Sequence, residues 1–339
     1  MPNVRLALAQ VNPIVGDMSG NAKLAITAVS EAAKSGAQIV ALPEMLVTGY
    51  PVEDLALRPS FQSASEAEVH RLASELELAG LGEVLVVVGF LKGTSSTDSV
   101  TLGVPRGAPM NCAAVIYRGA VVGEYAKHHL PNYGVFDEYR YFVPGTNSLI
   151  IRAFGVDIAI AICEDIWQDG KHMERIRNCD AGLLLVINGS PYERDKDDVR
   201  LNLVSTRAKE CNLHVAYVNM VGGQDELVFE GDSIIVDQTG EVLARAQQFE
   251  TDLLITDLDL PSANQATKLP DQVQLIDLPT PEPTIKEVAA KPQLPRLERT
   301  EETYRALVLG LRDYVNKNGF QSVLIGLSGG IDSAVVAAI

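Results

Sequence analysis

Short apolar runs bounded by turn residues or by charge recur through the first 260 residues, and they limit the folds open to this chain. The runs at 6–11, 39–42 and 84–90 are separated by segments whose apolar residues recur at helical spacing, which is typical of strand–helix–strand units. The runs at 112–117 and 121–125 stand only three residues apart, as in a β-hairpin. Together these patterns predict an α/β protein, an αββα four-layer sandwich with two facing sheets and helices outside.

Later runs extend the same pattern. We expect further strands at 149–153, 156–162, 183–188, 215–221, 233–237, 241–244 and 253–259, and helices at 21–36, 59–77 and 195–211. Seven prolines between 261 and 295 mark an extended linker. We therefore predict a first domain over 1–260, a proline-rich linker over 261–299 and the start of a second domain over 300–339. That last segment holds a helix, a strand within 321–327 and the start of another helix, too little to bury a core of its own.

Composition excludes several classes of partner. The net charge of −16 argues against binding to nucleic acid or to an anionic membrane, since both need clustered Lys and Arg. No stretch reaches the ~18 apolar residues of a membrane span, and no signal-like segment opens the chain. The four cysteines form no CxxC pair, which favours neither a disulfide framework nor a structural zinc site. A reducing, cytoplasmic location is expected.

Three ionisable residues stand at the ends of predicted strands. Glu44 comes after the run at 39–42 and Pro43, Lys127 after the run at 121–125 and Ala126, and Cys163 after the run at 156–162. A thiol with a pKa near 8.5 needs a base or a positive field to act as a nucleophile at neutral pH, and a carboxylate with an ammonium group supplies both. Taken singly, each residue has an ordinary structural explanation. The pair His128-His129 lacks a third ligand at a usual spacing, so no metal site is expected.

The segments around these residues resemble a known family. Leu42-Pro43-Glu44, the segment 127–133 and Ile162-Cys163-Glu164-Asp165 resemble the signatures of the nitrilase, or carbon-nitrogen hydrolase, superfamily. The run 134–138 is similar to its glutaminase branch, which precedes the synthetase part of glutamine-dependent NAD+ synthetases. The resemblance implies that Cys163 attacks the side-chain amide of glutamine to give a thioester, with no cofactor. It also implies that Glu44 is the general base, that Lys127 and the amide of Glu164 stabilise the oxyanion, and that the chain forms a homo-oligomer.

The same resemblance suggests which residues hold glutamine. The family's tyrosine, serine and basic residue fall on Tyr133, Ser190 and Lys196. Further candidates for the pocket wall are Glu164, Tyr50, Phe136 and Trp167. For Phe136 and Trp167 a place in the core is an equally open interpretation.

A second motif lies near the end of the chain. Its residues are Gly326, Ser328, Gly329, Gly330, Asp332 and Ser333. This run resembles the SGGxDS phosphate loop of ATP pyrophosphatases, in which backbone N–H groups before a helix approach a pyrophosphate. It departs from the Walker A pattern, which has a Lys before the last Ser. The resemblance implies that the full-length enzyme uses ATP, Mg²⁺ and deamido-NAD+.

These patterns lead to one main hypothesis and two alternatives. The main hypothesis is a glutamine amidohydrolase that supplies ammonia for NAD+ synthesis, of which this chain alone retains at most the glutaminase activity. The alternatives are a nitrilase-type amidase acting on another amide, and a non-catalytic module used for assembly.

Overall fold

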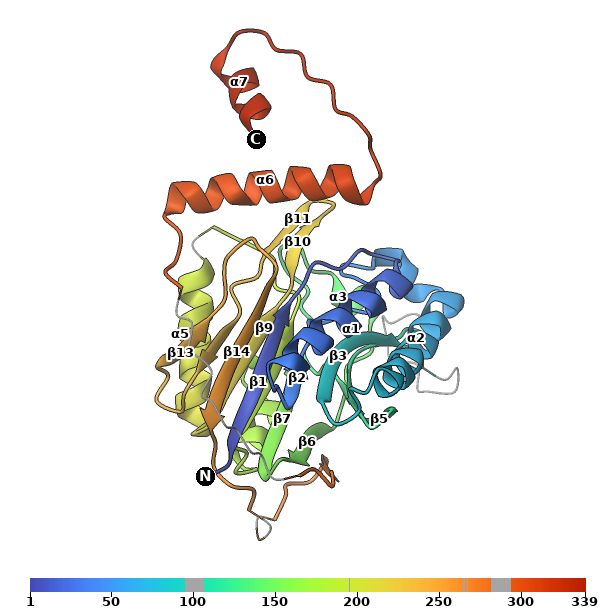
Figure 1. The fold of residues 1–339 in the computed structure, drawn as a ribbon, viewed down its shortest axis with the longest axis vertical. Helices are drawn as coiled ribbons and strands as arrows, with labels where there is room; N and C mark the ends of the chain where they lie inside the picture. Colours follow the sequence, from blue (N-terminus) through green and yellow to red (C-terminus); the bar gives the residue numbers. More distant parts are fainter. Residues whose placement is uncertain (95–106, 195, 265, 267, 282–293) are drawn as a thin grey trace.

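The computed structural model describes residues 1–94, 107–194, 196–264, 266, 268–281 and 294–339. Two sheets face each other and helices cover their outer faces, as the αββα prediction requires (Figure 1). In order across the first sheet lie β14 (Asp252–Asp259), β1 (Asn3–Gln10), β2 (Ile39–Ala41), β3 (Leu85–Lys92), β4 (Met110–Tyr117) and β5 (Ala120–Ala126). In order across the second lie β13 (Val242–Arg245), β12 (Ile234–Val236), β9 (His214–Asn219), β8 (Leu183–Asn188), β7 (Val156–Ile162), β6 (Ser148–Ala153) and β15 (Val273–Asp277).

Both faces of the central strands are buried, which explains their nearly continuous apolar sequences. In β7, Ile158 and Ile160 point into the core between the sheets, whereas Ala159 and Ala161 point toward the outer helices. The first sheet is covered by α1 (Met18–Lys34) and α2 (Pro59–Leu78), and the second by α4 (Lys171–Arg177) and α5 (Lys196–Cys211). This alternation follows from the two-residue period of a strand.

After residue 260, two segments differ from the sequence prediction. The proline-rich stretch contributes an unpredicted strand, β15, which pairs in parallel with β6. The predicted strand within 321–327 is wrong: the segment is irregular, and Val323 and Leu324 are exposed. A strand needs a hydrogen-bonding neighbour, and in the described part of the chain none lies beside it. The domain limits at 260 and 299 stay a prediction.

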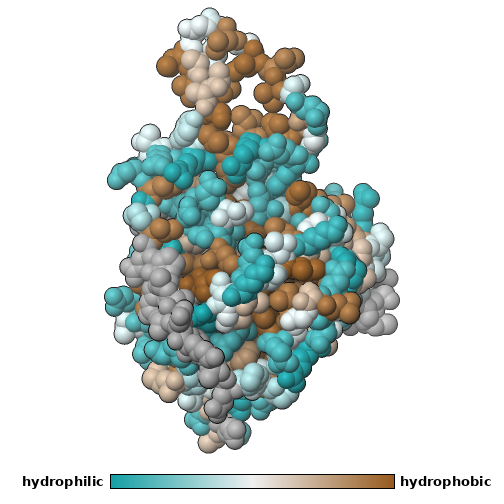
Figure 2. Space-filling model, in the orientation of Figure 1, coloured by the Kyte–Doolittle hydropathy of each residue, from teal (hydrophilic) through white to brown (hydrophobic). Residues whose placement is uncertain are grey.

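The C-terminal segment has two helices. The first, α6 (Arg299–Lys317), packs on the hairpin of β10 (Val221–Gln224) and β11 (Leu227–Glu230). The second, α7 (Ile331–Ala338), projects away from the body (Figure 1). Hydrophobic residues gather on the surface of this projecting segment (Figure 2). Among the described residues, no helix is both long and apolar enough to cross a bilayer.

Candidate active site

The ends of three strands place Glu44, Lys127 and Cys163 together. Glu44 and Lys127 follow β2 and β5 of the first sheet, and Cys163 follows β7 of the second. Lys127 Nζ donates a hydrogen bond to Glu44 Oε1 at 2.8 Å, and both side chains are 1% exposed. Cys163 is also buried and interacts electrostatically with both. A base, a cation and a thiol thus share one dry site.

Glu44 is held from several directions. Asn111 Nδ2 donates to its Oε1 at 2.7 Å, and the backbone N–H of Gly189 donates to its Oε2 at 2.7 Å. Behind it, a Cβ at Gly89 would lie 2.6 Å from the Glu44 Cα, so only glycine leaves room for this backbone. The carboxylate therefore has little freedom to turn away from Lys127.

A second carboxylate, Glu138 at the start of α3 (Glu138–Tyr141), completes the charge cluster. Lys127 Nζ donates to Glu138 Oε1 at 3.0 Å, and the Tyr50 hydroxyl donates to the same oxygen at 3.0 Å. Burial raises the pKa of Glu138 to about 7, against the field of Lys127 and with that of Glu44. Burial by itself lowers the pKa of Lys127, but Glu138 and Glu44 outweigh it and raise that pKa well above its usual value. Lys127 is therefore a fixed cation.

Sequence reasoning missed Glu138 as a site residue. It ends the 134–138 run on which the family resemblance partly rests, and that run was the only signal available. Nothing else in the local pattern points to it, because α3 is only four residues long and a single turn shows no helical periodicity.

The thiol of Cys163 is neutral in this environment. Burial raises its pKa well above the usual value, Glu44 adds to the rise, and Lys127 acts in the opposite direction. A preformed thiolate is thus disfavoured, and nucleophilic attack requires a base to accept the proton. The backbone at Cys163 has φ of 44°, a left-handed conformation that costs a non-glycine residue about 1–3 kcal/mol. The surrounding contacts must hold it there.

Asp165 supplies those contacts, and sequence reasoning gave it no role. Its buried carboxylate accepts the N–H of Ile162 at 3.0 Å and the N–H groups of His128 and His129 at 2.9 Å each. It also accepts the hydroxyl of Tyr125 at 2.7 Å. Burial by itself raises the pKa of Asp165. The side chain of His129, the field of His172 and the hydrogen bonds from the His129 N–H and the Tyr125 hydroxyl outweigh it and hold that pKa well below the usual value. One carboxylate thus ties the segment after Lys127 to the turn that carries Cys163.

One histidine of this region, His172, is fixed by hydrogen bonds. His172 is buried, and its ring nitrogens meet the hydroxyls of Tyr125 at 3.1 Å and Ser148 at 2.9 Å. Burial lowers the pKa of His172 to about 3, so its ring is neutral. Within the described ranges, no three His, Cys, Asp or Glu side chains come together as a metal site.

The predicted glutamine-binding residues have different locations. The Tyr133 hydroxyl donates to Glu164 Oε2 at 2.8 Å, and the Phe136 ring lies 5.7 Å from that of Tyr133, edge to face. Ser190 is buried, with its backbone N–H and carbonyl bound by the amide of Asn219. Glu164 directly follows Cys163 in the chain, and Ser190 directly follows Gly189, the donor to Glu44.

Two further candidates are placed less directly. Trp167 packs against the core beneath α4 and α5, on the outer face of the second sheet, which favours the core interpretation of this side chain. Lys196 begins α5, but its side chain lies outside the described residues.

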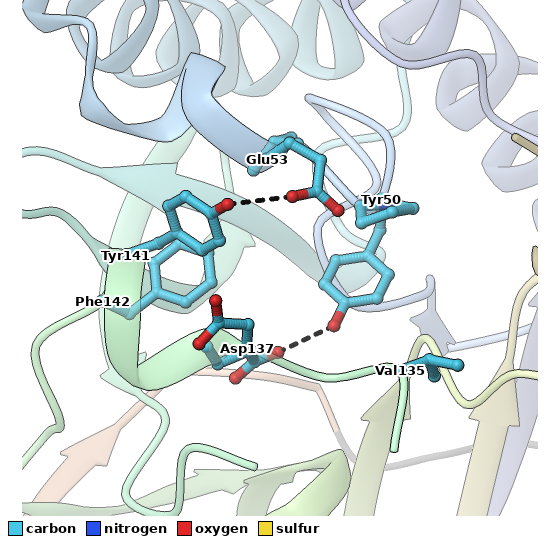
Figure 3. A pocket seen from close by; sticks show the side chains of 9 residues that line it. Tyr50, Glu53, Val135, Asp137, Tyr141 and Phe142 are labelled. Carbon is cyan, nitrogen blue, oxygen red and sulfur yellow. Dashed lines mark hydrogen bonds between the residues drawn. The ribbon is translucent and has the colours of Figure 1, made fainter. Parts of the chain in front are cut away.

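A pocket opens beside the charge cluster (Figure 3). It is a small pocket and is partly open to solvent. Its lining residues are Tyr50, Pro51, Val52, Glu53, Val135, Asp137, Glu138, Tyr141 and Phe142. Glu138 lies on its wall, so the pocket leads from the surface to the carboxylate that binds Lys127.

Of the phosphate-loop residues, Gly326, Ser328, Gly329 and Gly330 are exposed and precede α7, whereas Asp332 and Ser333 lie in its first turn. Loop and helix therefore occur in the predicted order without the predicted strand. The hydroxyl of Ser328 accepts the N–H of Gly330 at 3.3 Å, and that of Ser333 accepts the N–H of Ser328 at 3.2 Å. A Cβ at Gly329 would meet no atom within 4 Å. The small residues leave the loop open to a bulky anion.

Sequence families match both parts of the chain. The family described as Carbon-nitrogen hydrolase matches residues 5–268, and the family described as NAD synthase matches residues 303–339. The chain belongs to the carbon-nitrogen hydrolase family, and its residues 303–339 are similar to the NAD synthase family.

Among individual relatives, the glutamine-dependent NAD(+) synthetase of Thermotoga maritima is 40% identical over 352 residues, covering 100% of this chain and 58% of that protein. That of Acinetobacter baylyi is 35% identical and covers 100% of this chain and 55% of its own length. The chain therefore spans just over half the length of these curated relatives.

Solved structures agree with both levels of similarity. A glutamine-dependent NAD+ synthetase from Acinetobacter baumannii, in complex with ADP, superposes with a TM-score of 0.81 at 36% identity, covering 99% of this chain and 56% of that one. An amidase from Nesterenkonia sp. superposes with a TM-score of 0.61 at 25% identity, covering 76% of this chain and 90% of that one. The shorter amidase corresponds to the sandwich without the C-terminal segment.

Proposed function

We propose that this chain is the glutamine-hydrolysing part of a glutamine-dependent NAD+ synthetase. One observation carries the proposal: the buried cluster of Glu44, Lys127 and Cys163 stands in a carbon-nitrogen hydrolase domain that runs on into an NAD synthase segment. A base, a cation and a neutral thiol in a water-poor site suit acyl transfer from an amide. The synthetase segment gives the released ammonia a use.

In the first half of the reaction, Glu44 takes the proton of Cys163 as the sulfur attacks the side-chain carbonyl of glutamine. A C–S bond forms, and the carbonyl electrons move to oxygen. Lys127 Nζ and the N–H of Glu164 stabilise that oxyanion, a kind of contact worth about 3 kcal/mol per donor. The oxyanion then collapses, the C–N bond breaks, and Glu44 returns its proton to the leaving nitrogen, which departs as ammonia.

In the second half, water hydrolyses the thioester. Glu44 takes a proton from the water as the water oxygen attacks the thioester carbon. Lys127 Nζ and the N–H of Glu164 stabilise the new oxyanion. The C–S bond breaks, the sulfur recovers the proton from Glu44, and glutamate leaves. The step needs no cofactor, because the chain's own residues move every proton.

Selectivity for glutamine comes from groups at the mouth of the site. Glu164, held by Tyr133, suits the α-ammonium group of the substrate. Ser190 and Lys196 suit its α-carboxylate, and Tyr50 and Phe136 form the wall between them. A simple aliphatic amide would leave the buried Glu164 without its ammonium partner, at a cost that favours glutamine.

The remaining assignments concern the full-length enzyme. There, ammonia reacts with deamido-NAD+ activated by ATP and Mg²⁺, and the loop at 326–333 is the part of the nucleotide site carried by this chain. A cytoplasmic location is supported by Cys112, Cys163, Cys179 and Cys211, none of which forms a disulfide in the described structure. We also propose a homo-oligomer, which light scattering of the purified chain tests directly.

Release of ammonia and glutamate from glutamine by the purified chain tests the proposal. Cys163→Ala should abolish both, whereas Cys179→Ala, which removes a buried sulfur beneath α4 and α5, should leave them unchanged. Equal release by the Cys163→Ala variant would sink the mechanism. Faster turnover of aliphatic amides than of glutamine would instead indicate a general amidase. Failure of an electrophilic glutamine analogue to label Cys163 would indicate an assembly module.

A further inference from the structure

The helix α6 belongs to the NAD synthase segment but packs on the hydrolase body (Figure 1). Its buried residues are Glu302, Ala306, Leu309 and Asp313, which lie on one face at helical spacing. The two apolar members join Val221 of β10 and Phe249 in a small core. The two carboxylates stand at either end of this contact.

Asp313 makes the most specific contact of the pair. Its Oδ2 accepts the N–H of Gly223 in β10 at 2.7 Å and Asn12 Nδ2, in the loop after β1, at 2.7 Å. The Asp313 side chain is nearly buried. If its carboxylate were removed, little water could reach these two donors to accept their hydrogen bonds. Close packing adds to the contact: a Cβ at Gly223 would lie 2.9 Å from the Gly310 Cα.

Backbone hydrogen bonds continue from this contact to the active site. Val221, two residues before Gly223, donates its N–H to the Val11 carbonyl at 3.1 Å, and Met220 donates to the Asn188 carbonyl at 3.2 Å. Asn188 directly precedes Gly189, whose N–H binds Glu44 at 2.7 Å. The turn at 188–190 is therefore anchored to the strand that Asp313 holds.

We propose that Asp313 is a positioning residue for the glutaminase reaction. By fixing β10 against α6, it sets the turn at 188–190, whose Gly189 orients Glu44 and whose Ser190 would contact glutamine. The inference rests on the proposed function of that site. Because α6 lies in the segment similar to NAD synthase, the contact links that segment to the general base Glu44 through β10 and the turn at 188–190.

The test compares Asp313→Ala with Glu301→Gln in the full chain. Glu301 is an exposed carboxylate of the same helix, paired with Arg305, so its neutralisation changes charge without touching β10. Asp313→Ala should lower kcat/KM for glutamine by about tenfold, since small misplacements of a catalytic group carry losses of that order or more. Glu301→Gln should retain wild-type kinetics. Asp313→Asn keeps one acceptor oxygen and should recover part of the loss.

Two further readouts separate positioning from a merely structural role. The loss in Asp313→Ala should fall mainly on kcat rather than on KM, because Gly189 orients the catalytic carboxylate of Glu44. Labelling of Cys163 by an electrophilic glutamine analogue should slow in parallel. Asn12→Ala removes one donor to Asp313 and should change both readouts in the same direction by a smaller amount. This variant takes the place of Asp313→Ala in the test if Asp313→Ala does not fold.

The outcomes distinguish this inference from the proposed function. An active wild-type chain with unchanged kcat, KM and Cys163 labelling rate in folded Asp313→Ala overturns the positioning role alone. Unchanged kinetics in Asn12→Ala, where that variant is the one available, has the same consequence. A wild-type chain that releases no ammonia overturns the proposed function and this inference with it.

Discussion

Replacing Asp165 by asparagine removes the charge that ties the Cys163 turn to the segment after Lys127. The carboxylate accepts four hydrogen bonds, two at each oxygen. An asparagine has one oxygen, so its NH₂ group must face the donors at the other position. The Tyr125 hydroxyl can turn toward His172 Nε2, 3.1 Å away, whereas the backbone N–H of Ile162 has no such choice. The amide should therefore direct its NH₂ toward these two donors.

The expected loss of stability follows from the backbone N–H that is left without an acceptor. One buried N–H without an acceptor costs about 1–3 kcal/mol, and hydrogen bonds to a charged group are worth about 1.5–3 kcal/mol. We expect the free energy of unfolding to fall by roughly 2–4 kcal/mol. We also expect kcat to fall by about 100-fold, because the backbone of Cys163 loses the contact that holds its left-handed conformation.

Urea titration measures the first quantity and ammonia release the second. Asp169→Asn, a charge removal four residues away at an exposed carboxylate, is the matched control and should change little. A folded Asp165→Asn chain with wild-type stability and wild-type kcat would refute the argument.

The pH dependence of stability gives an independent check. The pKa of Asp165 is held well below its usual value in the folded protein. Its contribution is therefore present above the unfolded pKa of about 3.9 and is lost as pH falls below it. The stability of Asp165→Asn should consequently decline less steeply than that of the wild type below about pH 4.

Three further substitutions test the packing and charges of the site. Gly89→Ala places a Cβ 2.1 Å from the Met45 nitrogen, so unfolding in denaturant should require about 1–3 kcal/mol less; unchanged stability contradicts the steric argument. Lys127→Met leaves Glu44 and Glu138 without their cation, and a loss of about 3–5 kcal/mol should be partly recovered at low pH; a pH-independent loss argues against it. Because the pKa of Glu138 is raised to about 7, the folded protein keeps a proton on this carboxyl at pH values where the unfolded chain has lost it. Wild-type stability should therefore decline as pH rises from about 4 to 7. Glu138→Gln should flatten that decline in denaturation curves, and an equal slope would speak against the raised pKa.

The sequence predicted the layers of the fold and the meeting of three strand ends because both follow from local patterns. A strand buried on both faces requires a continuous apolar run, and the polar residues that follow this run lie at the end of the strand. Glu44, Lys127 and Cys163 all occupy such positions. The nearness of these three residues therefore follows from the order of apolar and polar residues along the chain.

Asp165 and β15 could not be predicted in the same way. The role of Asp165 depends on the N–H groups of His128 and His129, which are distant in the chain, and backbone groups leave no trace in side-chain patterns. The strand β15 lies between prolines and exists because β6 offers an edge to pair with. The run at 321–327 shows the converse, since an apolar sequence without a neighbouring strand forms none.

The charges of the site explain why a neutral thiol suits this chemistry. In the resting protein Lys127 is bound by Glu44 and Glu138, and these carboxylates raise the pKa of Cys163. When Glu44 takes the thiol proton during attack, its own charge disappears as the oxyanion forms. The negative charge has then moved from one neighbour of Lys127 to another, and the net charge of the buried site is constant. Because no new charge has to be buried, the desolvation cost that disfavours a preformed thiolate does not arise.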